Sequence, residues 1–128
     1  MTAPVAISLH ATRGATWKAA MRYRDADGNL IPVAGKNALA QVREKRDSEE
    51  IILTLSSANG RIILNDADAD GFNIRFLVAS TDTAALSPTN AKRELVCDLV
   101  LYDNASPPEI TPLFAATLTV HPLGTEVP

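Results

Sequence analysis

The string Asp66-Ala-Asp-Ala-Asp-Gly71 has the residue types and the spacing to bind a divalent cation. Aspartates at positions 1, 3 and 5, followed by glycine at position 6, form the first half of an EF-hand calcium loop. The second half is missing, because the loop ends on a bidentate glutamate and this chain has Leu77 there. A different calcium site, made by Asp66, Asp68 and Asp70 with Asp25 or Asp27, stays open as a weak alternative. Asp and Gly are common in turns, so we favour a solvated turn without metal.

Nucleophilic or zinc chemistry would depend on Cys97, His10 and His121, since the chain has one cysteine and two histidines. Cys97 falls on the inward face of a predicted strand, where burial raises the pKa of a thiol. Each histidine lies at the end of a predicted strand, and two histidines are too few for a zinc site. The sequence therefore predicts no catalytic residue, no metal site and no cofactor, and the protein is not expected to be an enzyme.

Two segments have the composition of protein contact sites. The first is the charged run at 42–50, whose alternating signs are typical of a solvated strand end and which, in an assembly, forms a polar rim. The second is the loop at 104–111, where prolines fix φ and stiffen an exposed segment that carries an isoleucine. The residues we expect at an interface are Arg43, Lys45, Arg46, Pro107, Pro108 and Ile110.

Length and charge set the limits within which these residues act. A chain of 128 residues with 46% hydrophobic side chains has material for one core, so we predict a single domain over 1–128, with its core at about 5–121 and a flexible tail at 122–128. A net charge of −3 argues against nucleic acid as a partner. No apolar run is long enough to cross a membrane, and Met1-Thr-Ala-Pro4 does not resemble a signal peptide. Synthesis in a cytoplasm is the expectation.

The elements that must position these residues are strands. Apolar and polar residues alternate repeatedly, and turn signals return about every 8 to 15 residues. Asn59-Gly60 favours a type I′ hairpin between the flanking strands. The eight predicted strands are 5–10, 15–24, 38–46, 51–56, 61–65, 72–78, 93–103 and 114–120.

A short helical turn is expected near 81–86, because Ser80-Thr-Asp-Thr83 contains residues that cap helices. The large core side chains are expected to be Trp17, Phe72, Phe76 and Phe114, in an otherwise aliphatic interior. Together the elements predict an all-β, Ig-like antiparallel β-sandwich of about seven or eight strands.

Three segments in order carry a resemblance to a known family: Arg13-Gly-Ala-Thr-Trp17, then the Asp25-to-Gly35 segment with its Asp-Gly-Asn turn, then Gln41-Val-Arg43. With the predicted turn at 57–60 and the closing strand, the chain resembles small virion-associated β-sandwich proteins of tailed bacteriophages, over roughly residues 9 to 120. It is similar to the N-terminal attachment domain of some baseplate upper proteins.

The resemblance implies a structural component of a phage particle that acts through protein–protein contacts in a tail, baseplate or fibre-attachment complex. The implied partners are other phage structural proteins, in a homo-oligomer or a symmetric multi-copy assembly, and the implied location is the virion. A carbohydrate- or receptor-binding module of a tail is the alternative. It would need exposed aromatic rings, and of Trp17, Tyr23 and Tyr102 the first two fall on the predicted buried face. A small glycan-degrading or metal-dependent enzyme is the third possibility.

Overall fold

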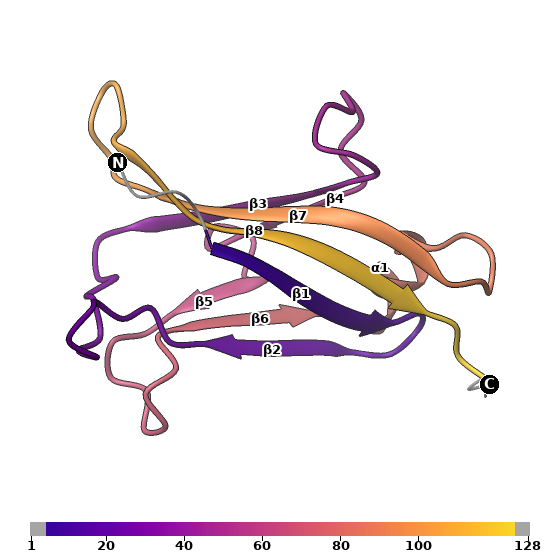
Figure 1. Ribbon diagram of the computed structural model, residues 1–128, viewed down its shortest axis with the longest axis horizontal. Coiled ribbons are helices and arrows are strands. Elements are labelled where there is room, and N and C mark those ends of the chain that lie inside the picture. The colour runs from indigo at the N-terminus through magenta and orange to yellow at the C-terminus, as the bar shows by residue number, and fades with distance from the viewer. Residues whose placement is uncertain (1–4, 125–128) are drawn as a thin grey trace.

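The computed structural model describes residues 5–124 and consists of two β-sheets stacked face to face (Figure 1). One sheet has five strands in the order β1-β8-β7-β3-β4, and the other has three in the order β2-β6-β5. A single helix, α1, joins the last strand of the small sheet to β7. The bounds are β1 Val5–Thr12, β2 Trp17–Met21, β3 Asn37–Arg43, β4 Leu53–Ser56, β5 Ile62–Leu64, β6 Ile74–Val78, α1 Ser80–Leu86, β7 Arg93–Tyr102 and β8 Ile110–His121.

The core lies between the sheets, where alternate residues of each strand point inward. On β7 the inward positions are Leu95, Cys97, Leu99 and Leu101, all buried. Three aromatic rings continue the core from the small sheet to the large one. Trp17 packs edge-on against Phe76, with ring centroids 5.6 Å apart, and Phe76 packs against Phe114 at 6.2 Å. These observations confirm the all-β sandwich and its mainly aliphatic interior.

One strand pair departs from the predicted antiparallel arrangement. β1 runs parallel to β8, with Val5 opposite Phe114 and Thr12 opposite His121. The parallel pairing follows from the path of the chain, because β1 leads into β2 of the other sheet and its neighbour β8 comes from the far end of the sequence. A two-residue hairpin can join only antiparallel strands, so local turn signals carry no information about this pair.

The predicted Asn-Gly hairpin is wrong. β4 and β5 do not pair, because β4 belongs to the five-stranded sheet and β5 to the three-stranded sheet. Gly60 has a positive φ of 79°, but Asn59 does not have the positive φ that a type I′ turn requires. The Asn59 side chain instead accepts hydrogen bonds from the backbone N–H groups of Ser56 and Arg61. The turn therefore passes the chain from one sheet to the other.

Two residues before β6 also differ from the prediction. Phe72, expected in the core, is half-buried at the surface with the Arg22 guanidinium 4.0 Å from its ring centroid. In the predicted strand 72–78 alternation puts Asn73 on the face opposite Phe72, that is, outward, but Asn73 is fully buried. The alternation fails here because β6 begins only at Ile74, so both residues belong to the preceding turn.

The helix and the C-terminal segment agree in part with what the sequence predicts. α1 covers the predicted turn at 81–86, but its N-cap is Ala79, which offers no side-chain hydrogen bond, so the expected capping residues lie inside the helix. Of the predicted flexible tail, residues 125–128 lie outside the described part. Leu123 is tied down, because its backbone N–H donates to Asn90 Oδ1 and its C=O accepts from Asn90 Nδ2.

Candidate functional site

The outer face of the five-stranded sheet contains an open hollow of about 210 Å³, which we call the outer trough. Its floor comes from β3 and β7, which pair so that Leu39 lies opposite Val100 and Gln41 lies opposite Asp98. These side chains point away from the core because their neighbours along each strand point into it. The lining residues are Leu39, Gln41, Arg43, Arg46, Val96, Asp98 and Val100.

The floor is partly apolar and only half-covered. Leu39 and Val100 pair at one end and Val96 lies at the other, with the polar pair Gln41–Asp98 between them. Leu39, Val96 and Val100 are all half-buried, although nothing within the two sheets packs above them. A further protein surface that covered them would remove apolar area from water, which is worth about 25 cal/mol for each Å². The trough therefore offers apolar area at both ends of its floor, around a polar pair that is already hydrogen-bonded to Arg46 through Asp98.

The connection between β3 and β4 forms one end of the trough. Arg46 reaches from it to the floor and makes two hydrogen bonds to Asp98, from Nε to Oδ2 at 3.0 Å and from Nη2 to Oδ1 at 2.9 Å. The Asp98 carboxylate raises the pKa of Arg46 through this bidentate contact. Arg43 donates to the carbonyls of Ser48 and Glu49 and to Gln41 Oε1. Both arginines therefore fix the shape of this segment, while the Lys45 side chain is exposed.

The connection between β7 and β8 lies at the opposite end of the same face. The Asp103 carboxylate accepts from the backbone N–H groups of Ala105 at 3.1 Å and Glu109 at 2.9 Å, and these bonds lower its pKa. Asn37 of β3 donates to Asn104 Oδ1 at 2.8 Å. Pro107 and Pro108 are exposed within this loop, and the Ile110 side chain just after it is 58% exposed.

Both groups of sequence-predicted interface residues thus belong to one face. In Figure 1 the two connections project from the five-stranded sheet, away from the three-stranded sheet, at opposite ends. The sequence indicated the two segments separately and missed the floor between them. Val96 and Val100 were detectable only as outward positions of an alternating strand, with nothing to indicate that Leu39 of another strand lies beside Val100.

The aspartates proposed as weak metal ligands have other partners. Asp66 accepts hydrogen bonds from the backbone N–H groups of Val33 and Ala34 at 2.9 Å each. Asp68 pairs with Arg75 at 2.8 Å, and this contact, with backbone hydrogen bonds, lowers the pKa of Asp68 to about 2. Asp70 is exposed. Over residues 5–124 no three side chains of His, Cys, Asp or Glu are grouped to hold a metal ion.

The two histidines, which the sequence treated separately, meet across β1 and β8. His10 Nδ1 lies 2.9 Å from His121 Nε2, so one ring donates a hydrogen bond to the other. Two imidazoles fall short of the three or four ligands of a zinc site. The pair joins β1 and β8, which are the first and last strands along the chain and neighbours in the sheet. Cys97 takes no part in the histidine pair. It is buried, and burial raises the pKa of its thiol to about 12.

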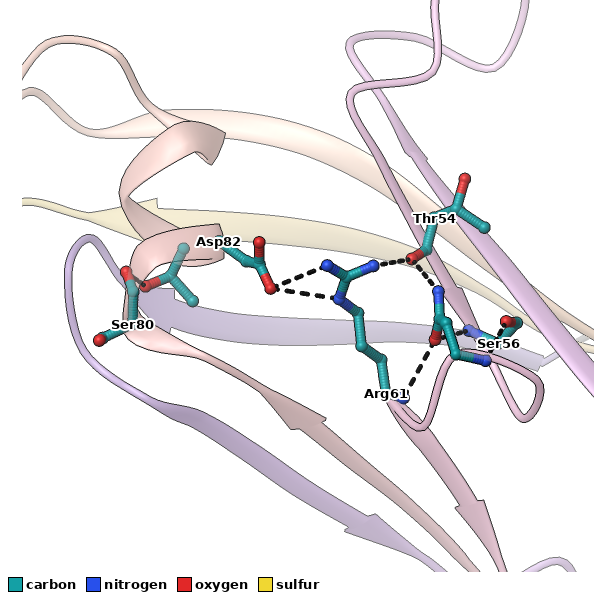
Figure 2. Close-up of polar contacts among 7 residues, drawn as sticks. Thr54, Ser56, Arg61, Ser80 and Asp82 are labelled. Atoms are coloured by element: carbon teal, nitrogen blue, oxygen red, sulfur yellow. Dashed lines mark hydrogen bonds and ion pairs between the residues drawn. The ribbon is translucent and has the colours of Figure 1, made fainter.

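A second polar cluster, shown in Figure 2, connects the two sheets with the helix. Arg61 donates to Asp82 Oδ2 of α1 from Nη2 at 2.9 Å and from Nε at 3.2 Å, and to the backbone carbonyl of Thr54 in β4 at 3.1 Å. Asn59 donates to the same carbonyl at 2.9 Å. Because these donors already have partners within the chain, the cluster serves to hold β4, β5 and α1 together.

Of the aromatic side chains considered for sugar stacking, Trp17 belongs to the core. Trp17 is 5% exposed and packs against Phe76, as the sequence predicted. Tyr23 and Tyr102 are half-buried.

Within the described residues no helix has the length and apolar character to span a membrane.

Comparison with known proteins adds no assignment. No protein-family model matches this chain. No curated protein matches it either.

Proposed function

We propose that this protein is a structural component of a tailed-phage particle and works through protein–protein contacts in a tail, baseplate or fibre-attachment complex. The resemblance of residues 9 to 120 to small virion β-sandwich proteins supports the setting. The observation that carries the proposal is that the two predicted contact segments lie at opposite ends of one half-covered, partly apolar floor. The outer trough is the proposed contact surface for another structural protein of the particle.

The chemistry of the trough suits a binding partner that is itself a folded protein. The apolar side chains on either side of the Gln41–Asp98 pair would supply most of the free energy of association; they are Leu39, Val96 and Val100. The charged groups at the Arg46 end would orient the partner and contribute less to affinity, because they are exposed.

The loops at both ends are held in place before any partner binds. Arg43 and Arg46 hold the β3–β4 connection, and Asp103 holds the β7–β8 connection. A surface that is already ordered loses little conformational entropy on association, which favours stable contacts in a particle.

Particles banded on a density gradient give the direct test. They should be produced from the phage genome that encodes this chain and analysed by quantitative mass spectrometry. The wild-type chain is expected at a fixed copy number that matches a symmetry of the particle. If the wild-type chain is absent from purified particles, the proposal is wrong.

A pair of variants then tests the trough. Val96→Glu puts a charge on its floor, whereas Leu77→Glu puts the same charge on an exposed apolar position of the other sheet. Both proteins should fold, and circular dichroism checks this. Val96→Glu is expected to deplete the chain from particles at least tenfold while Leu77→Glu leaves its copy number unchanged. Equal incorporation of the two variants would refute the trough as the contact surface.

A further inference from the structure

β1 is an edge strand without the features that normally protect an edge. It is the first strand of the five-stranded sheet, as its place at the margin in Figure 1 shows, and it extends over eight residues. Its sequence, VAISLHAT, has no lysine, arginine, aspartate, glutamate or proline. Exposed edges are usually short, charged or interrupted by proline, since a long uncharged edge invites another strand to pair with it.

The other three edges of the sandwich are short. β4 has four residues, β2 has five and β5 has three. β2 also carries a lysine, Lys18. β1 is therefore the one edge in the described part of the chain that can offer a long continuous row of backbone groups.

The free backbone groups of β1 belong to alternate residues. The N–H of Arg13 donates to the carbonyl of His121 in β8. This bond shows that the backbone groups of an odd-numbered residue point toward β8. Because the direction of N–H and C=O groups alternates along a strand, the odd-numbered residues of β1 face β8. Ala6, Ser8 and His10 therefore present both their N–H and their C=O to the open side.

The side chains next to this edge are also incompletely covered. Ile7 and Leu9 point toward the core but remain half-buried, and Val5 is 63% exposed. These three positions face the same side of the sheet as the core residues of β8 with which they align. A strand added beside β1 would cover them and complete the sheet.

We propose that β1 pairs with β1 of a second copy of this chain, in antiparallel orientation about a two-fold axis at Ser8. In this register Ser8 lies opposite Ser8 of the second copy, and Ala6 lies opposite its His10. The free N–H and C=O groups of Ala6, Ser8 and His10 in both strands are then used. Ile7 of each chain faces Leu9 of the other on the core side, which is a favourable apolar cross-strand pair.

Two features of β1 suit a second copy of this chain as the partner, namely its lack of charged residues and its length. A two-fold axis brings identical residues together, so a charged edge would repel itself, and β1 has no charged residue. Over residues 5–124 a copy of the chain has only one edge as long as β1, which is its own β1. Pairing joins the two five-stranded sheets into one continuous sheet. It is independent of the outer trough and would stand if the trough bound nothing.

A disulfide test addresses the register. In Ser8→Cys the two thiols would belong to directly opposed residues, whose Cα atoms lie about 5.5 Å apart in an antiparallel pair, within disulfide range. Thr117→Cys is the matched control, because Thr117 aligns with Ser8 on the adjacent strand β8 and is exposed. Cys97 is buried and should not react. Mild oxidation is expected to convert most of Ser8→Cys, and little of Thr117→Cys, into a covalent dimer.

Sedimentation velocity over a range of concentrations addresses the edge itself. Ser8→Pro removes an N–H that faces the open side and leaves the β1–β8 ladder intact, while Ser8→Ala keeps that N–H. The wild type and Ser8→Ala are expected to dimerise. Ser8→Pro should raise the dissociation constant about tenfold or more, because two hydrogen bonds across the axis are lost.

Three results would each overturn the proposal. They are a wild-type chain that stays monomeric up to millimolar concentration, a Ser8→Pro variant that dimerises as tightly as Ser8→Ala, and equal cross-linking of the two cysteine variants. The first of these would indicate that the edge is reserved for a different protein. None of them bears on particle incorporation through the trough, so the two proposals fail separately.

Discussion

The two sheets of this sandwich are stabilised in different ways. Four strands of the large sheet have seven to twelve residues, and their inward side chains form a continuous aliphatic layer. The strands of the small sheet have only three to five residues. Around it the chain is held by polar side chains that bond to backbone groups, including those of Asn73 and Asp66. Long strands support themselves through their ladders, whereas short strands depend on the connections between them.

The same difference separates the two outer faces. On the small sheet the guanidinium of Arg75 pairs with Asp68 and lies 5.2 Å from the Phe72 ring centroid, whose ring also contacts Arg22. These cations contribute to holding the turn at 66–71. On the large sheet Asp98 holds Arg46 of the β3–β4 connection, but the apolar side chains of the outer trough, Leu39, Val96 and Val100, are left half-covered. The apolar side chains that the fold leaves half-covered are the ones available for a partner.

Removing a core side chain of the large sheet should have the largest effect on stability. Leu99 is fully buried, so Leu99→Ala is expected to lower the free energy of unfolding by about 4 kcal/mol through lost burial and a residual cavity. Val100→Ala, at the next position but pointing into the trough, should cost about 1 kcal/mol or less. Urea denaturation measures both. Equal losses would contradict the division between the inner and outer faces of β7.

The small sheet should be most sensitive at a polar side chain. Asn73 accepts from the N–H of Tyr23 at 2.8 Å and donates to the carbonyl of Ile31 at 3.0 Å. Asn73→Leu leaves these two groups without a partner, and we expect a loss of about 2–3 kcal/mol in urea denaturation. Asn65→Leu is the control, since Asn65 is exposed and accepts one hydrogen bond, from Ala67. A neutral Asn73→Leu would show that the small sheet does not depend on this connection.

Acid should act on the small sheet through Asp68. Its pKa is about 2 in the folded protein against an ordinary value of 3.8, chiefly because of the hydrogen bond with Arg75. The folded state therefore binds fewer protons, and the stability that Asp68 contributes is present above pH 3.8 and is lost as the pH falls toward 2. Asp68→Asn should flatten the decline in stability over this range. Asp98→Asn, on the other sheet, is the comparison, and an unchanged slope in Asp68→Asn would contradict the assignment.

The smallest effect is expected at the ion pair on the outer trough. Arg46 and Asp98 have 52% and 42% of their side-chain surface exposed, so solvent screens their attraction. Arg46→Ala should change the free energy of unfolding by less than about 1 kcal/mol. Its consequence should appear in particle incorporation, through a loosened β3–β4 connection. A loss of stability as large as that of Asn73→Leu would show that the outer face is structural after all.

The sequence by itself determined the elements and the orientation of most side chains. Alternation placed Leu95, Cys97, Leu99 and Leu101 in the core, and it located the strands, because a strand with one buried face must alternate. The helix was located from a different signal, the Ser and Thr residues near its start. Alternation failed beside β6, where Phe72 and Asn73 continue the alternating pattern but lie in a turn. A side-chain pattern does not reveal where the backbone stops pairing.

Only the tertiary structure decided how the strands are distributed between the sheets. The Asn59-Gly60 turn has the residues of a hairpin, yet its strands belong to different sheets. β1 finds its partner more than a hundred positions along the chain, and Leu39 meets Val100 across 61 residues. Such pairings depend on which surfaces the whole chain can bury at once, and no local signal encodes them. For that reason the sequence indicated both ends of the outer trough but not its floor, and β1 but not its open edge.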